Sequence, residues 1–220
     1  MPRAQARIDL SAYARNLAAL RALAPNSQQM AIVKADAYGH GLLPMAQAAR
    51  DAGTEWLGVA LFNEALELRA NGDLGPILAW LASPEDPWAE VAQARIDLGI
   101  STAAQLERLT TFARVHLKID TGLGRAGCAP ADWPALIELA KRKQDAGQID
   151  VVGIWSHFTV ADEPTNPLNM VQIERFREAA QAAEILDVEH LHLANSAANL
   201  ALPDAHFTLV RPGIATYGIS

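Results

Sequence analysis

The chain has 220 residues, 50% of them hydrophobic and 20% charged, and a formal net charge of −7. This composition is ordinary for a globular protein of one large or two small domains, and the acidic balance argues against nucleic acid as a partner, because such a surface usually needs a basic patch. No apolar run approaches the roughly 18 residues expected of a membrane span, and the N-terminal segment lacks the apolar core of a signal peptide. The lone Cys128 cannot form an internal disulfide, so we expect a cytoplasmic protein with no membrane partner.

Helical and strand patterns alternate along the chain. The first helical pattern covers residues 8–24, where Asp9 or Ser11 can cap the helix and Pro25 ends it. Short apolar runs typical of buried strands follow at 31–33, 56–61, 77–81, 96–100, 114–120, 151–155, 190–193 and 207–210. Between and after them the patterns predict helices at 42–52, 63–70, 86–94, 102–112, 131–145, 167–186 and 196–201.

Strand runs that alternate with helices in this way, eight times over, predict an α/β fold of the (β/α)8 barrel type. A doubly wound parallel sheet is the structural competitor, but the regularity of the units favours closure into a barrel. No break in composition marks a domain boundary, so we expect a single domain over residues 1–220.

The stretch 31–41 reads Ala-Ile-Val-Lys-Ala-Asp-Ala-Tyr-Gly-His-Gly. It places Lys34 at the carboxyl end of a short buried strand, ahead of a polar turn bounded by glycine. Apolar surroundings disfavour the ammonium form and lower the pKa of the lysine. Its amine is then prepared to attack a carbonyl and form a Schiff base. A lysine that snorkels at the strand end is the other interpretation, and spacing alone does not decide between the two.

Polar residues recur at the carboxyl ends of the predicted strands, where barrel enzymes carry their chemistry. They are Lys34, Lys118, Asp120 with Arg125 beyond it, Ser156, His157, Asn195, Ser196, Arg211 and Gly213. A barrel would bring these residues to one mouth, although they lie far apart in the sequence. Several different ionisable residues around one rim predict a functional site.

A phosphate-binding site is predicted at the seventh and eighth strands, where barrels commonly hold phosphate. Asn195 and Ser196 open a short helical turn, so the Ser196 hydroxyl and nearby backbone N–H groups can bind phosphate oxygens. Gly213 and Ile214 lie beside this turn on the neighbouring strand and offer further N–H groups. A simple helix cap is the alternative interpretation of Ser196.

Two further motifs suggest other classes of site. Residues 122–127 match the G-x-G-x-x-G pattern of dinucleotide-binding proteins, but Cys128 to Pro130 separate the motif from the next helix, and no acidic residue ends the following strand. His190 and His192 alternate along a strand as metal ligands can. No third ligand clusters with them, so packing is the better interpretation and we expect no metal.

Five segments resemble those of alanine racemases, in the order that this family has them. Residues 34–41 are similar to the pyridoxal-phosphate attachment signature, with Asp36 where asparagine is more usual, and the other segments are 118–127, 157–162, 192–198 and 211–218. The resemblance covers the chain from about residue 5 to its end. It implies a pyridoxal 5'-phosphate-dependent enzyme that racemises L- and D-alanine and supplies D-alanine for cell-wall peptidoglycan.

The resemblance also implies roles for individual residues. Lys34 would form the Schiff base with the cofactor, and His157 would lie near the cofactor ring. Arg125 would approach the phenolic oxygen of the cofactor and the carboxylate of the substrate. The residues that would contact the phosphate are Tyr38, Asn195, Ser196, Gly213 and Ile214.

Arg211 would face the pyridine nitrogen of the cofactor. An arginine stays protonated and donates to this nitrogen, which leaves the nitrogen without its own proton and weakens the cofactor as an electron sink. A short-lived carbanion suits a racemase, which must return a proton to Cα. His192 could orient Arg211 from the adjacent strand, or could be a satisfied core histidine. Lys118, whose equivalent is carbamylated in some relatives, could hold Arg125, or could form a plain structural pair with Asp120.

Length is the main departure from the racemase pattern. The family has a C-terminal β-domain after its barrel, and we expect this domain to be absent from the 220-residue chain. Racemisation needs acid–base groups on both faces of Cα. Lys34 would serve one face, and in the family the tyrosine for the other face comes from the partner subunit. We therefore expect a homodimer for the full protein, and weak or no activity for this chain alone. The alternative function is a non-catalytic, single-domain pyridoxal-phosphate-binding protein of cofactor homeostasis.

Overall fold

Parallel strands form the centre of the structure, a computed structural model that describes residues 4–219. They are β1 (Gln28–Ile32), β2 (Trp56–Leu61), β3 (Ile77–Leu81), β4 (Asp97–Ile100), β5 (Ala113–Lys118), β6 (Ile149–Trp155), β7 (His190–His192) and β8 (Leu209–Val210). Neighbouring strands are hydrogen-bonded in the order β7-β6-β5-β4-β3-β2-β1-β8. The predicted domain range of 1–220 includes residues 1–3 and 220, which lie outside the described residues.

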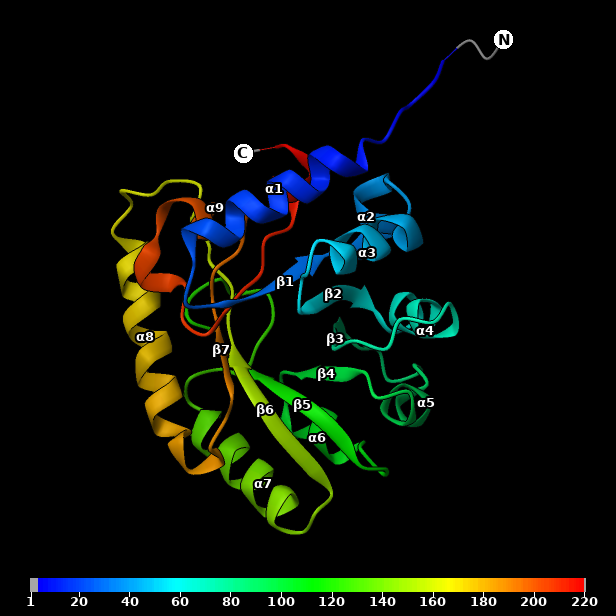
Figure 1. Cartoon of the computed structure of the whole chain (residues 1–220). Helices are drawn as coiled ribbons and strands as arrows, with labels where there is room; N and C mark the ends of the chain where they lie inside the picture. The colour runs from blue at the N-terminus through cyan, green and yellow to red at the C-terminus, as the bar shows by residue number, and fades with distance from the viewer. Residues whose placement is uncertain (1–3, 220) are drawn as a thin grey trace.

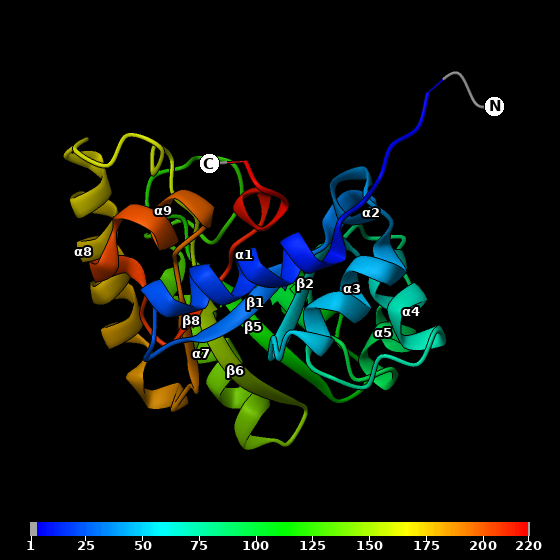
Figure 2. The same ribbon diagram turned by 45° about the horizontal axis from the view of Figure 1, so that its top comes forward.

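The outer strands of this order, β7 and β8, meet and close the sheet into a barrel. The backbone N–H of Thr208 donates to the oxygen of Leu191 at 3.1 Å, and that of Arg211 donates to the oxygen of Ala194 at 3.0 Å. The ribbon views show the strands surrounded by helices, with α3, α4 and α5 on one side and α7 and α8 on another (Figures 1 and 2). The predicted (β/α)8 barrel is therefore confirmed, and an open doubly wound sheet is excluded.

The helices connect successive strands and cover the outside of the barrel. They are α1 (Leu10–Leu23), α2 (Lys34–Gly39), α3 (Leu42–Asp51), α4 (Phe62–Ala70), α5 (Trp88–Gln93), α6 (Ala103–Glu107), α7 (Trp133–Asp145), α8 (Leu168–Ala182) and α9 (Ser196–Ala201), with the 3₁₀ helices η1 (Glu184–Leu186), η2 (Pro203–Ala205) and η3 (Ile214–Tyr217). The cap of α1 is Asp9, whose Oδ1 accepts from the N–H of Ala12 at 2.9 Å. Among residues 4–219, none of the helices combines the length and the apolar character of a membrane-spanning segment.

Three elements depart most clearly from the predicted patterns. The helix predicted over 102–112 ends at Glu107, because the β-branched pair that follows, residues 110–111, disfavours a helix. The helix predicted over 167–186 divides at Ala183, whose N–H bonds the oxygen three residues back and tightens the chain into η1. Strand β8 begins after Phe207, because the φ of 47° at this residue does not fit a strand.

The segment after β1 forms a left-handed helical turn, α2. Residues 35–38 all have φ between 51° and 55°, so the polar turn predicted here is a short helix of the opposite hand. L-residues avoid this conformation at a cost of roughly 1–2 kcal/mol each. At the far end of the turn, the Asp36 Oδ1 accepts from the backbone N–H of Leu42 at 2.7 Å and so ties the turn to α3.

Side chains of each strand alternate between the outside and the inside of the barrel. One apolar cluster, which includes Leu57, joins the strands to the surrounding helices. A second cluster lies against the other face of the strands and consists of Met30, Ile32, Trp56, Leu78 and Leu209. The interior also holds polar groups: a Cβ atom at Gly153 would overlap the ring of the buried His116, so glycine makes room for this imidazole.

Candidate functional site

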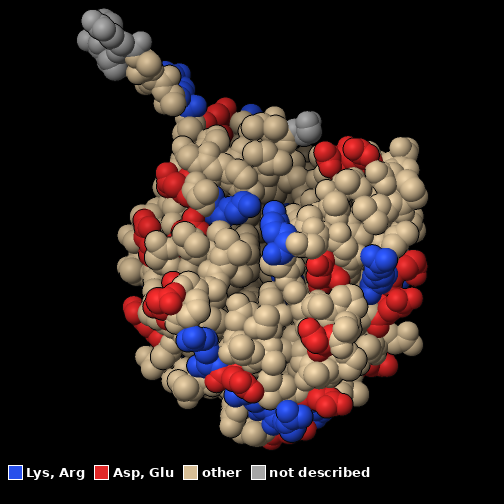
Figure 3. Space-filling view, turned by 180° about the vertical axis from the view of Figure 1, so that it is seen from behind, with Lys and Arg blue, Asp and Glu red and all other residues tan. Residues whose placement is uncertain are grey.

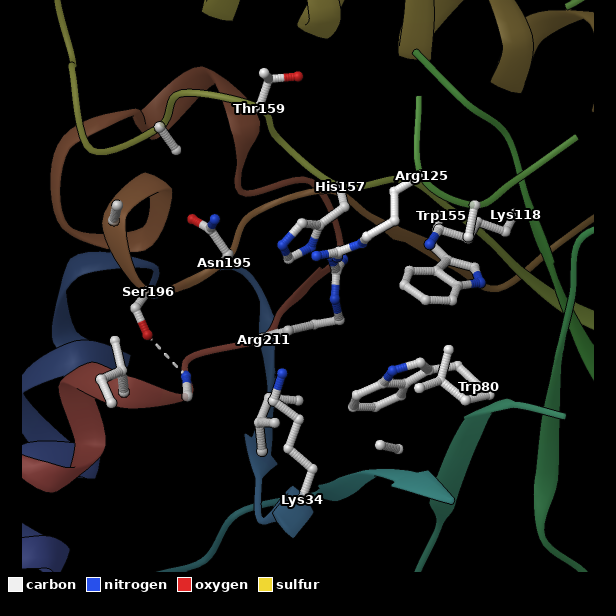
Figure 4. A pocket seen from close by; sticks show the side chains of 18 of the residues that line it. Lys34, Trp80, Lys118, Arg125, Trp155, His157, Thr159, Asn195, Ser196 and Arg211 are labelled. Carbon is white, nitrogen blue, oxygen red and sulfur yellow. Dashed lines mark hydrogen bonds between the residues drawn. The ribbon is translucent and has the colours of Figure 1, made fainter. Parts of the chain in front are cut away.

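A cavity of about 610 Å³ opens at the carboxyl ends of the barrel strands. Residues from strand ends and from the loops after them line it. They include every residue to which the resemblance assigns a cofactor or substrate contact, namely Lys34, Tyr38, Arg125, His157, Asn195, Ser196, Arg211, Gly213 and Ile214, whereas Asp120 and Ser156 of the predicted rim are not among the lining residues. Figure 4 shows several of these side chains converging from different elements. The barrel therefore brings together residues that are distant in the sequence, as the strand pattern predicts.

Positive side chains dominate the charged groups of this cavity. Lys34, Lys118, Arg125 and Arg211 line it, and among the described lining residues Asp162 is the single carboxylate. The space-filling view shows Lys and Arg side chains beside a hollow near the centre of one face, with Asp and Glu mostly toward its edge (Figure 3). The cavity is therefore suited to an anionic ligand.

Lys34 is the first residue of the left-handed turn. Burial lowers the pKa of its amine, the Arg125 guanidinium lowers it further, and the Glu64 carboxylate acts in the opposite direction. Its Nζ lies 5.7 Å from the centre of the Tyr38 ring, and its side chain extends toward Arg211 (Figure 4). More of this amine is unprotonated at neutral pH than in an exposed lysine, as a nucleophile or base requires.

Ser196 and Gly213 lie at the centre of the predicted phosphate site. The Ser196 Oγ accepts the backbone N–H groups of Gly213 at 2.8 Å and Ala215 at 3.2 Å, so its own O–H is left to donate to an anion. The cap of α9 is Asn195, whose Oδ1 accepts from the N–H of Ala198 at 3.0 Å. The interpretation of Ser196 as a simple helix cap is therefore wrong.

The Tyr38 hydroxyl lies directly beside the backbone of Gly213. A Cβ atom at this glycine would overlap the Tyr38 Oη, so no larger residue fits without movement. Burial raises the pKa of Tyr38, and the phenol is a neutral donor at physiological pH. Tyr38 and Ser196 thus present two hydroxyl groups to the space beside Gly213 and Ile214.

Arg211 is buried, with 5% of its surface exposed. Its Nη2 donates to the backbone oxygens of Ser156 at 2.8 Å and Leu193 at 3.2 Å, and its Nη1 donates to the Nδ1 of His192 at 3.2 Å. Burial lowers its pKa to about 9, so the guanidinium keeps its charge at neutral pH. Arg211 is therefore a rigidly held cationic donor at the cavity.

A chain of buried hydrogen bonds runs from Arg211 into the barrel. The Nε2 of His192 and the Nδ1 of His116 are 2.8 Å apart, and the Nε2 of His116 lies 3.2 Å from the Oδ2 of Asp97. Burial and then the Arg211 charge lower the pKa of His192 well below its usual value. Its ring is therefore neutral, accepts on Nδ1 and donates from Nε2, and His116 in turn donates to Asp97. This network favours the interpretation of His192 as a residue that orients Arg211.

His190, the other histidine of β7, has a packing role. Its ring lies edge-on to that of Trp56, with the ring centres 5.0 Å apart, as the sequence predicts. Within residues 4–219 no three His, Cys, Asp or Glu side chains are grouped so that they could hold a metal ion.

Lys118 packs on an aromatic ring. Its Nζ lies 4.4 Å from the centre of the Trp155 ring. Burial, Arg211 and Arg125 lower the pKa of Lys118 to about 8, although Asp120 acts in the opposite direction. The Asp120 carboxylate accepts the backbone N–H groups of residues 122 and 124 and so shapes the loop that carries Arg125. The predicted Lys118–Asp120 pair is not found among the ion pairs of the described part of the chain.

His157 and Arg125 lie at the rim of the cavity. Burial and the surrounding charges, of which Arg211 and Arg125 act most strongly, lower the pKa of His157 to about 3, so its imidazole is neutral at physiological pH. Arg125 is exposed on the loop after β5, and the two side chains point toward one another and toward Arg211 (Figure 4). Arg125 is thus placed to bind a negatively charged group that enters the cavity from solvent.

Two tryptophans of the cavity are absent from the predicted site. Trp155 stacks on the His192 ring with 5° between the planes and 5.7 Å between the centres, and its ring lies 5.2 Å from the Cζ of Arg211. Trp80 lies edge-on to Trp155 at 6.0 Å. The sequence feature that could have identified Trp155 is its position at the carboxyl end of a predicted strand, two residues before His157.

Comparisons with known proteins point to one family. The family model described as alanine racemase, N-terminal domain, matches residues 8–220. The alanine racemase of Streptomyces coelicolor is 50% identical over 99% of this chain and 59% of its own length.

Solved structures of alanine racemases are also similar. The structure from D-cycloserine producing Streptomyces lavendulae has a TM-score of 0.94 at 48% identity, over 97% of this chain and 58% of its own. The Bacillus anthracis structure with bound L-Ala-P has a TM-score of 0.84 at 31% identity, over 97% of this chain and 57% of its own. The chain therefore spans between 57% and 59% of the length of these three relatives.

Proposed function

The chain belongs to the alanine racemase family, and from this premise we propose that it forms the pyridoxal 5'-phosphate-binding barrel of an enzyme that interconverts L- and D-alanine. One observation carries the proposal: a single cavity holds Lys34 with its lowered pKa, the predicted phosphate site at Ser196 and Gly213, and the buried Arg211. The Bacillus anthracis relative has L-Ala-P bound, which supports a ligand of this type for the cavity.

The residues of the cavity fit pyridoxal 5'-phosphate. The cavity has a volume of about 610 Å³, which falls within the roughly 300–1,000 Å³ of common small-molecule pockets. Gly213 keeps open a space beside the Tyr38 hydroxyl that a Cβ atom would fill. The O–H of Ser196 is available to donate to an acceptor such as a phosphate oxygen. The amine of Lys34 would be the covalent attachment point for the aldehyde carbon.

The remaining residues would bind and orient. Arg211, charged because its pKa is about 9, would donate to the ring nitrogen, and the neutral His157 would pack near the ring. Asn195 and Ile214 would complete the phosphate site with Tyr38. Arg125 at the rim would bind the carboxylate of alanine.

Lys34, freed from its bond to the cofactor when the substrate amine takes its place, would exchange the proton at one face of the substrate Cα. When bound, the cofactor withdraws electrons from Cα and so makes its C–H bond easier to break. An amine of lowered pKa is a suitable base for this proton at neutral pH. The base for the opposite face would come from a partner subunit, in a region of the longer relatives that this chain does not match, and this requires a homodimer. We further propose a cytoplasmic reaction that supplies D-alanine for peptidoglycan.

Attachment of the cofactor at Lys34 is the direct test. The purified chain is mixed with pyridoxal 5'-phosphate, reduced with borohydride and digested, and the modified peptide is identified by mass spectrometry. We expect the modification on Lys34 and its loss in Lys34→Ala. Modification at other lysines, unchanged in Lys34→Ala, would overturn the assignment.

Formation of D-alanine separates the racemase from a non-catalytic cofactor-binding protein. Both would attach pyridoxal 5'-phosphate at Lys34, but a binding protein would form no D-alanine in any assembly. The family match and the structural similarity both concern alanine racemases, and they favour the enzyme. The assay is made on the chain alone and on the chain with a relative's remaining segment joined to it, and we expect activity to be much higher in the joined form.

A further inference from the structure

The carboxylate of Glu64 joins the ends of two neighbouring strands. Glu64 lies in the first turn of α4, and its Oε2 accepts the backbone N–H groups of Ala60 at 3.0 Å and Leu61 at 2.9 Å, at the end of β2. Its other oxygen, Oε1, accepts the backbone N–H of Ala35 at 2.5 Å. That N–H belongs to the peptide that directly follows Lys34. One side chain therefore contacts both the start of α4 and the start of the left-handed turn, α2, whose first residue is Lys34.

The Ala35 N–H has no acceptor within its own turn. The first hydrogen bond inside the left-handed turn is donated by Ala37, and N–H groups that precede the first such bond of a helix need a partner from outside. Ala35 also has a φ of 54°, which L-residues disfavour, so the turn persists because contacts from elsewhere hold it. Asp36 makes one such contact at the far end of the turn, and Glu64 makes the one beside the lysine.

We propose that Glu64 is a positioning residue for Lys34: by holding the Ala35 N–H, its carboxylate fixes the peptide after the lysine and directs Nζ into the cavity. The inference deepens the proposed function and rests on it for the role of Lys34 as the cofactor attachment point. Glu64 is not among the described residues that line the cavity. It therefore acts through the backbone and not through contact with a ligand.

The charged groups that face Lys34 come from several elements. Arg125, on the loop after β5, lowers the pKa of Lys34, and Glu64, on α4, raises it. The positive charge of Lys34 helps to lower the pKa of His157, after β6, and His157 is therefore neutral. Tyr38, within the turn, has a raised pKa and is also neutral. Removal of the Glu64 charge alone would lower the pKa of Lys34, increase the unprotonated fraction of its amine at neutral pH and so favour attachment. Loss of its hydrogen bond would misdirect the amine and weaken attachment, so the two effects are distinguishable.

Glu64→Gln is the test, and Glu67→Gln is its matched control, because Glu67 is exposed on the same helix. A glutamine has one acceptor oxygen and cannot serve both strand ends. Reductive ¹³C-methylation with NMR titration gives the pKa of Lys34 without cofactor, and Lys34→Arg assigns its signal among the chain's four lysines. Titration with pyridoxal 5'-phosphate, followed by borohydride reduction and mass spectrometry, gives the affinity at Lys34. Thermal unfolding shows that each variant is folded.

For Glu64→Gln we expect the pKa of Lys34 to fall by roughly half a pH unit or more. We expect the affinity for pyridoxal 5'-phosphate to fall about tenfold or more, and Glu67→Gln to change neither. An affinity that is unchanged or higher in folded Glu64→Gln overturns the proposal.

Glu64→Asp is measured in parallel, in case the glutamine variant does not fold. It keeps the charge but is too short to reach both strand ends, so we expect weaker attachment with a smaller change in pKa, and wild-type affinity would overturn the proposal. Failure of the wild-type chain to attach the cofactor at Lys34 would instead contradict the proposed function. The cofactor-free titration of Glu64→Asp then decides the inference, because this variant keeps the charge but loses the hydrogen bond, and a Lys34 pKa equal to that of wild type overturns it.

Discussion

The guanidinium of Arg211 and the imidazole of His192 share a hydrogen bond of 3.2 Å, with 5% of the arginine and 0% of the histidine exposed. The histidine is bonded in turn to His116, and His116 to Asp97. The cation that would face the cofactor ring is therefore held from below by a column of polar groups inside the barrel, in addition to the backbone oxygens of Ser156 and Leu193 at the ends of β6 and β7.

Replacement of His192 by leucine removes one acceptor of the buried Arg211. A buried charged donor without its partner costs about 1–3 kcal/mol, so we expect the free energy of unfolding in urea to fall by this amount. His192→Asn places an amide oxygen near the position of Nδ1 and should recover part of the loss. Equal unfolding free energies for the two variants would show that Arg211 does not depend on this acceptor.

Ala35→Gly should stabilise the chain. Ala35 is exposed with a φ of 54°, so glycine loses no packing and removes the strain of a Cβ atom at positive φ. We expect a gain of about 1 kcal/mol, which corresponds to a rise of about 2–4 °C in Tm by calorimetry. Ala37→Gly is the control: Ala37 is fully buried at a φ of 51°, so lost packing should offset the relief. A Tm no higher than that of wild type for Ala35→Gly would argue against strain in the turn.

Lys118 should make stability rise with pH in the alkaline range. Its pKa is lowered from 10.5 to about 8, so between these values the unfolded chain binds a proton that the folded chain does not, and the free energy of unfolding increases with pH across this window. Below it, the buried cation costs about 3 kcal/mol. We therefore expect Lys118→Met to be more stable than wild type at pH 7, and its advantage to shrink by about this amount as the pH approaches 10.5.

Urea titrations of the cofactor-free protein at fixed pH values from neutral to alkaline check the effect of Lys118. Arg211 and the tyrosines are present in both proteins, so their contributions largely cancel in the difference between wild type and variant, which reports the lysine. A constant difference across the window would mean that Lys118 keeps its ordinary pKa in the folded state.

Gly213→Ala should weaken both folding and cofactor binding. Its Cβ atom would overlap the Tyr38 hydroxyl, and overpacking of this kind costs about 1–3 kcal/mol. Tyr38→Phe removes that oxygen, so Gly213→Ala should cost less in the Tyr38→Phe background than in wild type. The coupling is measured as a double-mutant cycle of unfolding free energies, and a coupling of zero would show that the two residues do not compete for this space.

The barrel and its rim could be predicted because the signals are local and repeated. Each strand is a short apolar run bounded by polar or glycine residues, and in a barrel the carboxyl ends of the strands meet at one face. This geometry alone brings Lys34, His157 and Arg211 together. Their individual roles were predicted from the resemblance to alanine racemases, because spacing alone left two interpretations of Lys34 open.

The left-handed turn could not be predicted in this way. Residues 35–38 contain no glycine, and alanine, aspartate and tyrosine all prefer the right-handed region. The N–H of Ala35 finds its acceptor in Glu64, which is 29 positions away in sequence. Trp155 was missed for a similar reason, because its role depends on which neighbours its ring meets across the barrel.

The left-handed turn reverses the usual preference for amino-acid chirality at its positions. Residues 35–38 have the backbone angles that D-amino acids adopt in their own helices. A D-alanine at position 35 would lie in its energy minimum there, although the same replacement within α1 or α8 would disrupt the helix. The lysine proposed to exchange a proton with alanine thus lies at the start of a stretch of L-residues whose backbone has the mirror-image handedness of an ordinary helix, and the carboxylate of Glu64 on α4 binds the first N–H after that lysine.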